Sequence, residues 1–205
     1  MPMRSLLLVL FALAVRPVMA IETPDYRVIE QQGAFELREY SAYLLAETEV
    51  EAGFMNAGNV AFGRLFRYIS GANQAKVEIA MTAPVEQAKQ GEKIAMTAPV
   101  EQASGDGVFR VAFIVPKKYS KETVPLPLDP RVQIREVSPR TVAAWRYSGR
   151  WTEENFRAYE QKLRSVLAER GLTAVPGDSA IIARYDAPFM PWFMRRNEVL
   201  IPLER

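Results

Sequence analysis

The chain has 205 residues, with 26 basic and 24 acidic side chains and neither His nor Cys. Without these two residue types the usual zinc and copper sites are excluded, and so are Ser-His-Asp and Cys-His catalytic groups. We therefore expect no metal site and name no catalytic residue. The nearly balanced charge provides no basic face, so we also expect no nucleic-acid partner.

The first 20 residues, MPMRSLLLVLFALAVRPVMA, are typical of a secretory signal peptide. Arg4 supplies the positive start, residues 6–15 are apolar, and small residues lead to Ala20. An uncleaved membrane anchor is the alternative, but a span needs about 20 apolar residues. We expect cleavage near Ala20, a periplasmic or secreted location, and one domain over residues 21–205.

In the first half, apolar patterns predict strands at 35–40 and 42–52. The period then becomes that of a helix over 54–69, with Gly71 at its end. One face of this helix carries Phe62, Leu65, Phe66 and Ile69. A strand at 107–116 and an extended Pro-rich crossing at 124–130 follow.

The second half repeats this order. Residues 132–149 align with 35–52 at an offset of 97, which places Arg135 over Arg38. A second helix begins after Thr152, a favoured N-cap residue, and ends near Gly171. Strands are expected within 179–189 and at 197–202. The fold class is therefore α+β: a distorted antiparallel β-barrel from two pseudo-symmetric halves, each contributing one amphipathic helix.

A ten-residue phrase, IAMTAPVEQA, occurs at 79–88 and again at 94–103. Its alternation predicts a strand in each copy, and the polar segment between the copies predicts an antiparallel hairpin. Pro84 and Pro99 cannot donate to a sheet, so pairing should end there or lie at an edge. We interpret the repeat as a device that lengthens a hairpin.

Three segments carry a resemblance to a known family: PDYRVIEQQGAFELREY, LFRYISGAN leading into IAMTAPV, and YDAPFMPWFMRRNEVLIPL. In this order they are similar to the SOUL haem-binding family, and the resemblance covers essentially all of residues 21–205. It implies a distorted β-barrel of two pseudo-symmetric halves with a helix each, which agrees with the internal repeat. One MTAPV strand suffices in the animal members of the family, so the second copy is an insertion-like departure.

The resemblance also implies a tetrapyrrole in an apolar cleft beside the first helix, with a basic group near its propionates. Carried over to this sequence, the cleft comprises Asn59, Phe62, Phe66 and Arg67 on the helix, and Met190, Trp192 and Arg195 in the last loop. Met190 falls about where relatives have a Lys, and no His exists to bind iron. We expect haem to bind without His ligation or without any axial ligand. Apolar contacts would hold it, together with a forked pair of hydrogen bonds from the guanidinium of Arg67, Arg195 or Arg196 to its carboxylates.

Structural interpretations compete with these assignments. Phe62 and Phe66 lie at the centre of a helical stripe, which is usually core. Met81 and Met96 at alternating strand positions are more often packing than thioether ligands. The segment PFMPWFMRR (188–196) is equally typical of a loop folded back as core.

Three classes of function remain. We favour an exported binding protein for haem or another flat apolar ligand. The alternative is an interaction module whose 188–196 loop docks on a protein or makes peripheral contact with a membrane. An enzyme with a Glu or Tyr base is least supported, because the sequence indicates no perturbed acid–base pair.

Overall fold

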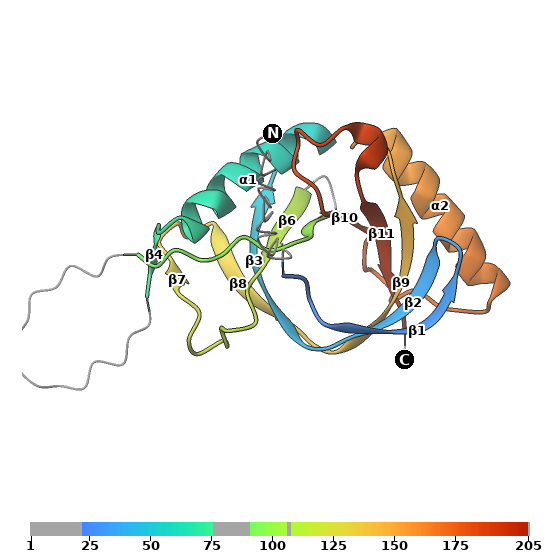
Figure 1. The fold of residues 1–205 in the computed structure, drawn as a ribbon, viewed down its shortest axis with the longest axis horizontal. Coiled ribbons are helices and arrows are strands. Elements are labelled where there is room, and N and C mark those ends of the chain that lie inside the picture. The colour runs from blue at the N-terminus through green and yellow to red at the C-terminus, as the bar shows by residue number, and fades with distance from the viewer. Residues whose placement is uncertain (1–21, 76–90, 106–107, 205) are drawn as a thin grey trace, which may run out of the picture.

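The computed structural model describes residues 22–75, 91–105 and 108–204 (Figure 1). The strands are β1 (Tyr26–Gln32), β2 (Phe35–Tyr40), β3 (Tyr43–Val50), β4 (Asn73–Gln74), β5 (Val100–Gly105), β6 (Val108–Ile114), β7 (Leu126–Pro127), β8 (Val132–Val137), β9 (Arg140–Tyr147), β10 (Ile181–Arg184) and β11 (Asn197–Pro202). The helices are α1 (Phe54–Ile69) and α2 (Glu153–Glu169). Nine strands form one sheet in the order β1-β2-β9-β11-β10-β5-β6-β3-β8, and β4 pairs with β7 separately.

The large sheet has an internal two-fold relation. Phe35 of β2 pairs with Trp145 of β9, and Val132 of β8 pairs with Thr48 of β3. These two pairs are equivalent, because Val132 is 97 residues after Phe35 and Trp145 is 97 residues after Thr48. The equivalent strands β2 and β8 therefore each pair with a strand of the other half. The two halves also meet where β5 pairs with β10. The expected α+β, barrel-like fold of two related halves is confirmed, as a sheet curled into a half-barrel (Figure 1).

Both helices cover the outer face of the curled sheet (Figure 1). α1 buries Ala57, Ala61 and Leu65 against β3, β6 and β8, because these residues recur every four positions along one face. α2 buries Phe156, Leu163 and Leu167 against β9 and β11. Its N-terminus is capped as expected, since the Thr152 side chain accepts a hydrogen bond from the backbone N–H of Asn155 at 3.2 Å.

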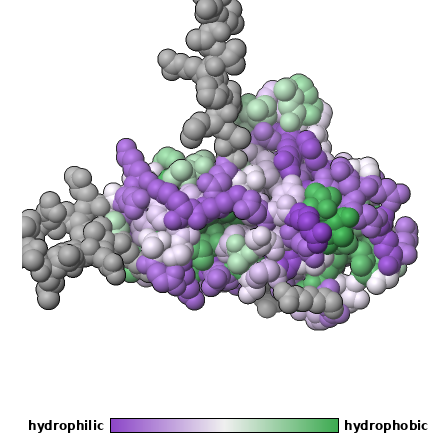
Figure 2. Space-filling view, turned by 60° about the horizontal axis from the view of Figure 1, so that its bottom comes forward, coloured by the Kyte–Doolittle hydropathy of each residue, from purple (hydrophilic) through white to green (hydrophobic). Residues whose placement is uncertain are grey.

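The inner face of the sheet carries many charged side chains. A cluster of apolar residues that includes Leu45 and Ala112 lies beside Glu47 and Arg110 of the same strands. Figure 2, in which the lower side of the molecule comes forward, shows a largely hydrophilic surface with separate hydrophobic patches. The two faces of one sheet therefore have different chemistry, apolar under the helices and charged inside the curl.

Two features differ from the expectations. β1 has no counterpart among the predicted strands, because six of its seven residues are exposed and leave no alternating pattern. Residues 94–99 are not a strand, since pairing begins only at Val100, directly after Pro99. In this segment Ile94 and Thr97 are buried while Met96 is exposed, so the expected alternation is wrong there.

The remaining expectations fall on other parts of the chain. The first copy of the phrase, and with it the predicted hairpin, lies outside the described residues, as does the expected signal peptide. None of the helices in the described ranges combines the length and the apolar character that a membrane crossing requires.

Candidate ligand-binding site

One flank of α1 presents aromatic side chains to solvent. Gly58, Phe62 and Phe66 follow one another at intervals of four residues and so share a face. The rings of Phe62 and Phe66 stack with centroids 5.8 Å apart, and Phe62 also meets the edge of Phe113 on β6 at 5.3 Å. The exposed fractions of Phe62 and Phe66 are 39% and 46%, so these two rings lie on the surface of the protein rather than in its core.

The helical stripe predicted from the sequence therefore divides in two. Leu65 and Ile69 are buried as core residues, whereas Phe62 and Phe66 lie at its edge. Asn59 and Arg67, the other two candidates on α1, are exposed. All four candidates on α1 are thus accessible to a ligand.

The loop between β10 and β11 (residues 185–196) spans the space between the N-terminal ends of α1 and α2 (Figure 1). It contains a short helix, η1 (Trp192–Met194), and Trp192 is half exposed. Phe189 has an exposed fraction of 88%, and Phe193 and Met194 are also exposed, while Met190 is partly buried. The interpretation of this loop as core therefore does not hold for its aromatic residues.

Two of the three arginines expected to meet ligand carboxylates already have partners. Arg195 donates from Nε to the carbonyl of Met190 at 2.8 Å and from Nη2 to that of Pro188 at 2.6 Å, which braces the loop. Arg196 donates from Nε and Nη2 to one Glu198 oxygen at 3.1 and 2.8 Å. Arg67 alone of the three has its side chain exposed on α1.

A fourth arginine, Arg184 at the end of β10, was not indicated by the sequence. Its guanidinium carbon lies 5.8 Å from the ring centre of Phe54 and 5.3 Å from that of Trp151. A Cβ added to Gly58 would lie 3.0 Å from Arg184 Nη1 and 3.5 Å from the side-chain oxygen of Gln102. Arg184 therefore lies at the N-terminal end of the aromatic flank of α1.

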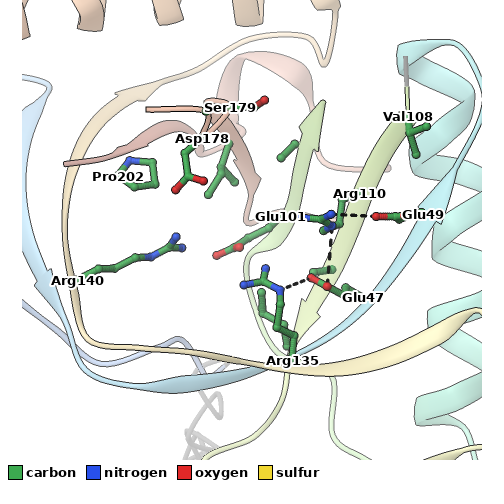
Figure 3. Close-up of a pocket in the computed structure, with 15 residues that line it drawn as sticks. Glu47, Glu49, Glu101, Val108, Arg110, Arg135, Arg140, Asp178, Ser179 and Pro202 are labelled. Atoms are coloured by element: carbon green, nitrogen blue, oxygen red, sulfur yellow. Dashed lines mark hydrogen bonds and ion pairs between the residues drawn. The ribbon is translucent and has the colours of Figure 1, made fainter. Parts of the chain in front are cut away.

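The inner face of the sheet holds a separate cavity of about 300 Å³ (Figure 3). Glu47 binds Arg135 at 2.8 Å and Arg110 at 3.8 Å, and Arg110 binds Glu49 at 2.9 Å. These four charges satisfy one another. A ligand in this cavity would have to compete with ion pairs already formed.

Glu101 also faces this cavity and is 6% exposed (Figure 3). Its carboxylate accepts a hydrogen bond from the Tyr43 hydroxyl at 3.4 Å, and the same hydroxyl accepts one from Arg140 Nη2 at 2.8 Å. Burial raises the pKa of Glu101, and the charges of Arg140 and Arg135 oppose the rise. The inner cavity thus holds a polar network, while the apolar contact surface lies on the helix side.

Comparison with known proteins identifies relatives along most of the chain. Heme-binding protein 1 of Xenopus tropicalis is 29% identical over 167 residues, which are 81% of this chain and 82% of the relative. Heme-binding protein 1 of Mus musculus is 29% identical over 185 residues, covering 88% and 92%. Heme-binding protein 2 of Homo sapiens is 28% identical over 157 residues, covering 74% and 72%.

Solved structures show the same fold at much lower identity. The C-terminal domain of EcmrR superposes with a TM-score of 0.59 at 10% identity, covering 88% of this chain and 98% of that domain. A hydrolase from Listeria innocua superposes with a TM-score of 0.54 at 8% identity, covering 86% of this chain and 94% of that chain. The family model described as SOUL heme-binding protein matches residues 21–202. This chain therefore belongs to the SOUL haem-binding protein family.

Proposed function

We propose that this protein binds haem or a similar flat tetrapyrrole along the aromatic flank of α1, without a His ligand. The observation that carries the proposal is the stacked pair Phe62–Phe66, which leaves 39% and 46% of these side chains in contact with water. Burial of such rings against a flat ligand yields about 25 cal/mol for each Å² of apolar area removed from water. The names of the relatives support the same ligand class.

Iron coordination by His is excluded for the whole chain, which contains none. Apolar contact and arginine side chains are then the means by which the chain holds the ligand. We also propose that the protein acts after export, because residues 1–20 have the pattern of a cleaved signal peptide. We expect the protein in the exported fraction, with an N-terminal sequence that begins near Ile21. Protein found only in the cytoplasmic fraction with Met1 retained would contradict export.

Titration of hemin into the purified protein, followed by its Soret absorbance, tests the binding proposal. We expect saturable binding by the unmodified chain and about tenfold weaker binding by Phe66→Ala, since a buried aromatic ring contributes about 1.5–3 kcal/mol. Leu128→Ala is the matched control, because Leu128 is an exposed apolar residue (56%, against 46% for Phe66) and follows β7 in the separate β4–β7 pair. Absence of any Soret change with the unmodified chain would overturn the proposal.

A second candidate function rests on the loop. Phe189, Phe193 and Met194 are 88%, 61% and 62% exposed, which is typical of a surface that docks on a protein or a membrane. Co-sedimentation with anionic phospholipid vesicles tests the membrane form. Binding that is lost in Phe193→Asp and kept in Leu128→Asp would favour it, and absence of sedimentation would exclude it.

A further inference from the structure

Arg184 is a partly buried cation, and one edge of its guanidinium is enclosed without a hydrogen-bond partner. Its Nε and Nη2 atoms are both inaccessible to solvent and have no hydrogen-bond partner within the described ranges 22–75, 91–105 and 108–204. Burial lowers the pKa of Arg184 to about 10, with a smaller opposing contribution from Tyr147, so the group is still charged at neutral pH. An unpaired buried charge is costly, and such a group in a folded protein indicates a missing partner.

The unpaired edge has the geometry that recognises carboxylates. Nε–H and Nη2–H of arginine point in parallel and match two oxygens of one carboxylate. Elsewhere in this chain the same pair of donors performs that task, because Arg131 holds the two oxygens of Asp129 at 2.9 and 2.7 Å. Arg184 presents an equivalent fork without an acid of the described chain to fill it.

Two further polar groups near Arg184 are unpaired. The side-chain oxygen of Gln102, a residue only 3% exposed, and the hydroxyl of Tyr147, 5% exposed, have no partner in the part of the chain that the structure describes. Burial raises the pKa of Tyr147 to about 12, and the charge of Arg184 opposes the rise. The Tyr147 hydroxyl therefore remains protonated and can donate to an anion.

The start of α1 adds a second source of positive potential. Its N-cap is Gly53, which makes no side-chain capping bond, and its first turn contains no acid. α2 differs in both respects, with Thr152 as cap and Glu153 and Glu154 in its first turn. The free N–H groups and dipole of an uncapped helix start favour an anion, and Arg184 lies beside this start at Phe54 and Gly58.

We propose that Arg184 is a binding site for a carboxylate group, placed at the end of the aromatic flank of α1. Both donors are enclosed, so binding displaces side chains that cover them. The loop is the element positioned to move, because it packs on Trp151 through Arg195, with the Arg195 guanidinium 4.2 Å from the Trp151 ring centre. The guanidinium groups of Arg184 and Arg195 both lie near the Trp151 ring, at 5.3 and 4.2 Å from its centre, and an anion bound at Arg184 offsets the repulsion between the two charges.

Two sources can supply the carboxylate. One is an acid side group of a tetrapyrrole lying along Phe62 and Phe66, and this form rests on the proposed function. The other is a free small carboxylate. Hemin, hemin dimethyl ester and citrate separate the sources, because the ester keeps the flat apolar body of hemin and lacks its acid groups.

In the tetrapyrrole form, the unmodified chain binds hemin at least about tenfold more tightly than the ester, as expected for hydrogen bonds to a charged group. Arg184→Met binds the two equally, since Met keeps the length of the side chain without its donors. Arg184→Lys keeps the charge without the fork and recovers only part of the preference. Arg131→Met, which removes an exposed arginine elsewhere, leaves the preference unchanged.

In the free-carboxylate form, citrate raises the melting temperature of the unmodified chain and not that of Arg184→Met, and hemin and its ester bind alike. The proposal is overturned when Arg184→Met alters neither the preference for hemin nor the effect of citrate. Equal binding of hemin and ester without a citrate effect also overturns it, yet leaves the proposed function intact. Failure of all tetrapyrroles to bind, with a citrate effect that requires Arg184, overturns the proposed function alone.

Discussion

Arg38 and Arg184 are arginines with enclosed guanidinium donors on opposite faces of one sheet, and their surroundings are opposite in kind. Arg38 is 0% exposed on the inner face and donates from Nη1 and Nη2 to the two oxygens of Glu198 at 2.6 and 3.0 Å. Its Nε donates to Glu36 at 2.8 Å. Arg184, on the helix face, has two donors without a partner among the described residues.

The difference shows that burial of a charge does not reveal its role. Arg38 and Glu198 join β2 to β11, across β9, and thereby connect strands that are 160 residues apart in sequence. Arg184 connects nothing within the described chain through its free edge, which is the property of a binding group rather than a structural one.

The largest effect is expected from breaking the satisfied site. Arg38→Met should lower the free energy of unfolding by about 3–5 kcal/mol, because it leaves the buried Glu198 carboxylate without its main partner. Arg196→Met is the control, since Arg196 is partly exposed and binds the same carboxylate from the rim. Urea unfolding measures both; a loss no greater for Arg38→Met than for Arg196→Met would contradict a structural role for Arg38.

The opposite sign is expected at the unsatisfied site. Arg184→Met should raise the free energy of unfolding of the ligand-free protein by about 1–3 kcal/mol, because it removes buried donors that have no partner. This corresponds to a rise in melting temperature of roughly 2–12 °C for a chain of this size. Arg131→Met should leave stability nearly unchanged, because exposed ion pairs contribute little. A stability loss in Arg184→Met would show that the free edge has a structural partner.

A third comparison concerns two buried acids of the inner face. For Glu198, burial favours the protonated form, but Arg38 and Arg196 outweigh it and hold the pKa of Glu198 below its ordinary value. Its contribution to stability is therefore present above the ordinary pKa of Glu and is lost as pH falls through the lowered pKa. For Glu101 burial prevails and raises the pKa.

Glu101 should therefore have the reverse pH dependence. A folded state that holds its proton more tightly loses stability as pH rises from the ordinary pKa of Glu through the raised value. Glu101→Gln should be more stable than the unmodified chain by about 1 kcal/mol at pH 7 and equally stable near pH 4. Unfolding curves at the two pH values measure this; a stability gain of the same size at both would contradict the assignment.

Most of the fold could be predicted because its signals are local. The strands 35–40 and 197–202, the two helices and the internal repeat follow from apolar periods of 2 and 3.6 residues. β1 could not be predicted, because an exposed edge strand needs no apolar face and is held by pairing with β2. At residues 94–99 the alternation was misleading, since Thr97 donates its hydroxyl proton to the carbonyl of Ile114 and is buried.

The candidate site was predictable to a smaller extent. An aromatic loop and an aromatic helix face are visible in sequence, and the structure shows both exposed. Arg195 and Arg196 stood out because they are adjacent, yet their donors are used by loop carbonyls and by Glu198. Arg184 has no local pattern. Its importance lies in the partner it lacks, which depends on side chains from β5, α1 and residue 151 meeting in space.

The smallest expected effect uses two glycines of α1 to test how closely Arg184 is confined. Gly63→Ala should raise the free energy of unfolding by about 1 kcal/mol, because nothing lies within 4 Å of the added Cβ and Ala favours the helix. Gly58→Ala should raise the free energy of unfolding by a smaller amount, since its Cβ would lie 3.0 Å from Arg184 Nη1. In the Arg184→Met background the two alanine substitutions should raise the free energy of unfolding by nearly equal amounts. Urea unfolding of the double variants measures this. A difference that persists without the guanidinium would place the constraint at Gln102 instead, whose side-chain oxygen is the next nearest atom at 3.5 Å.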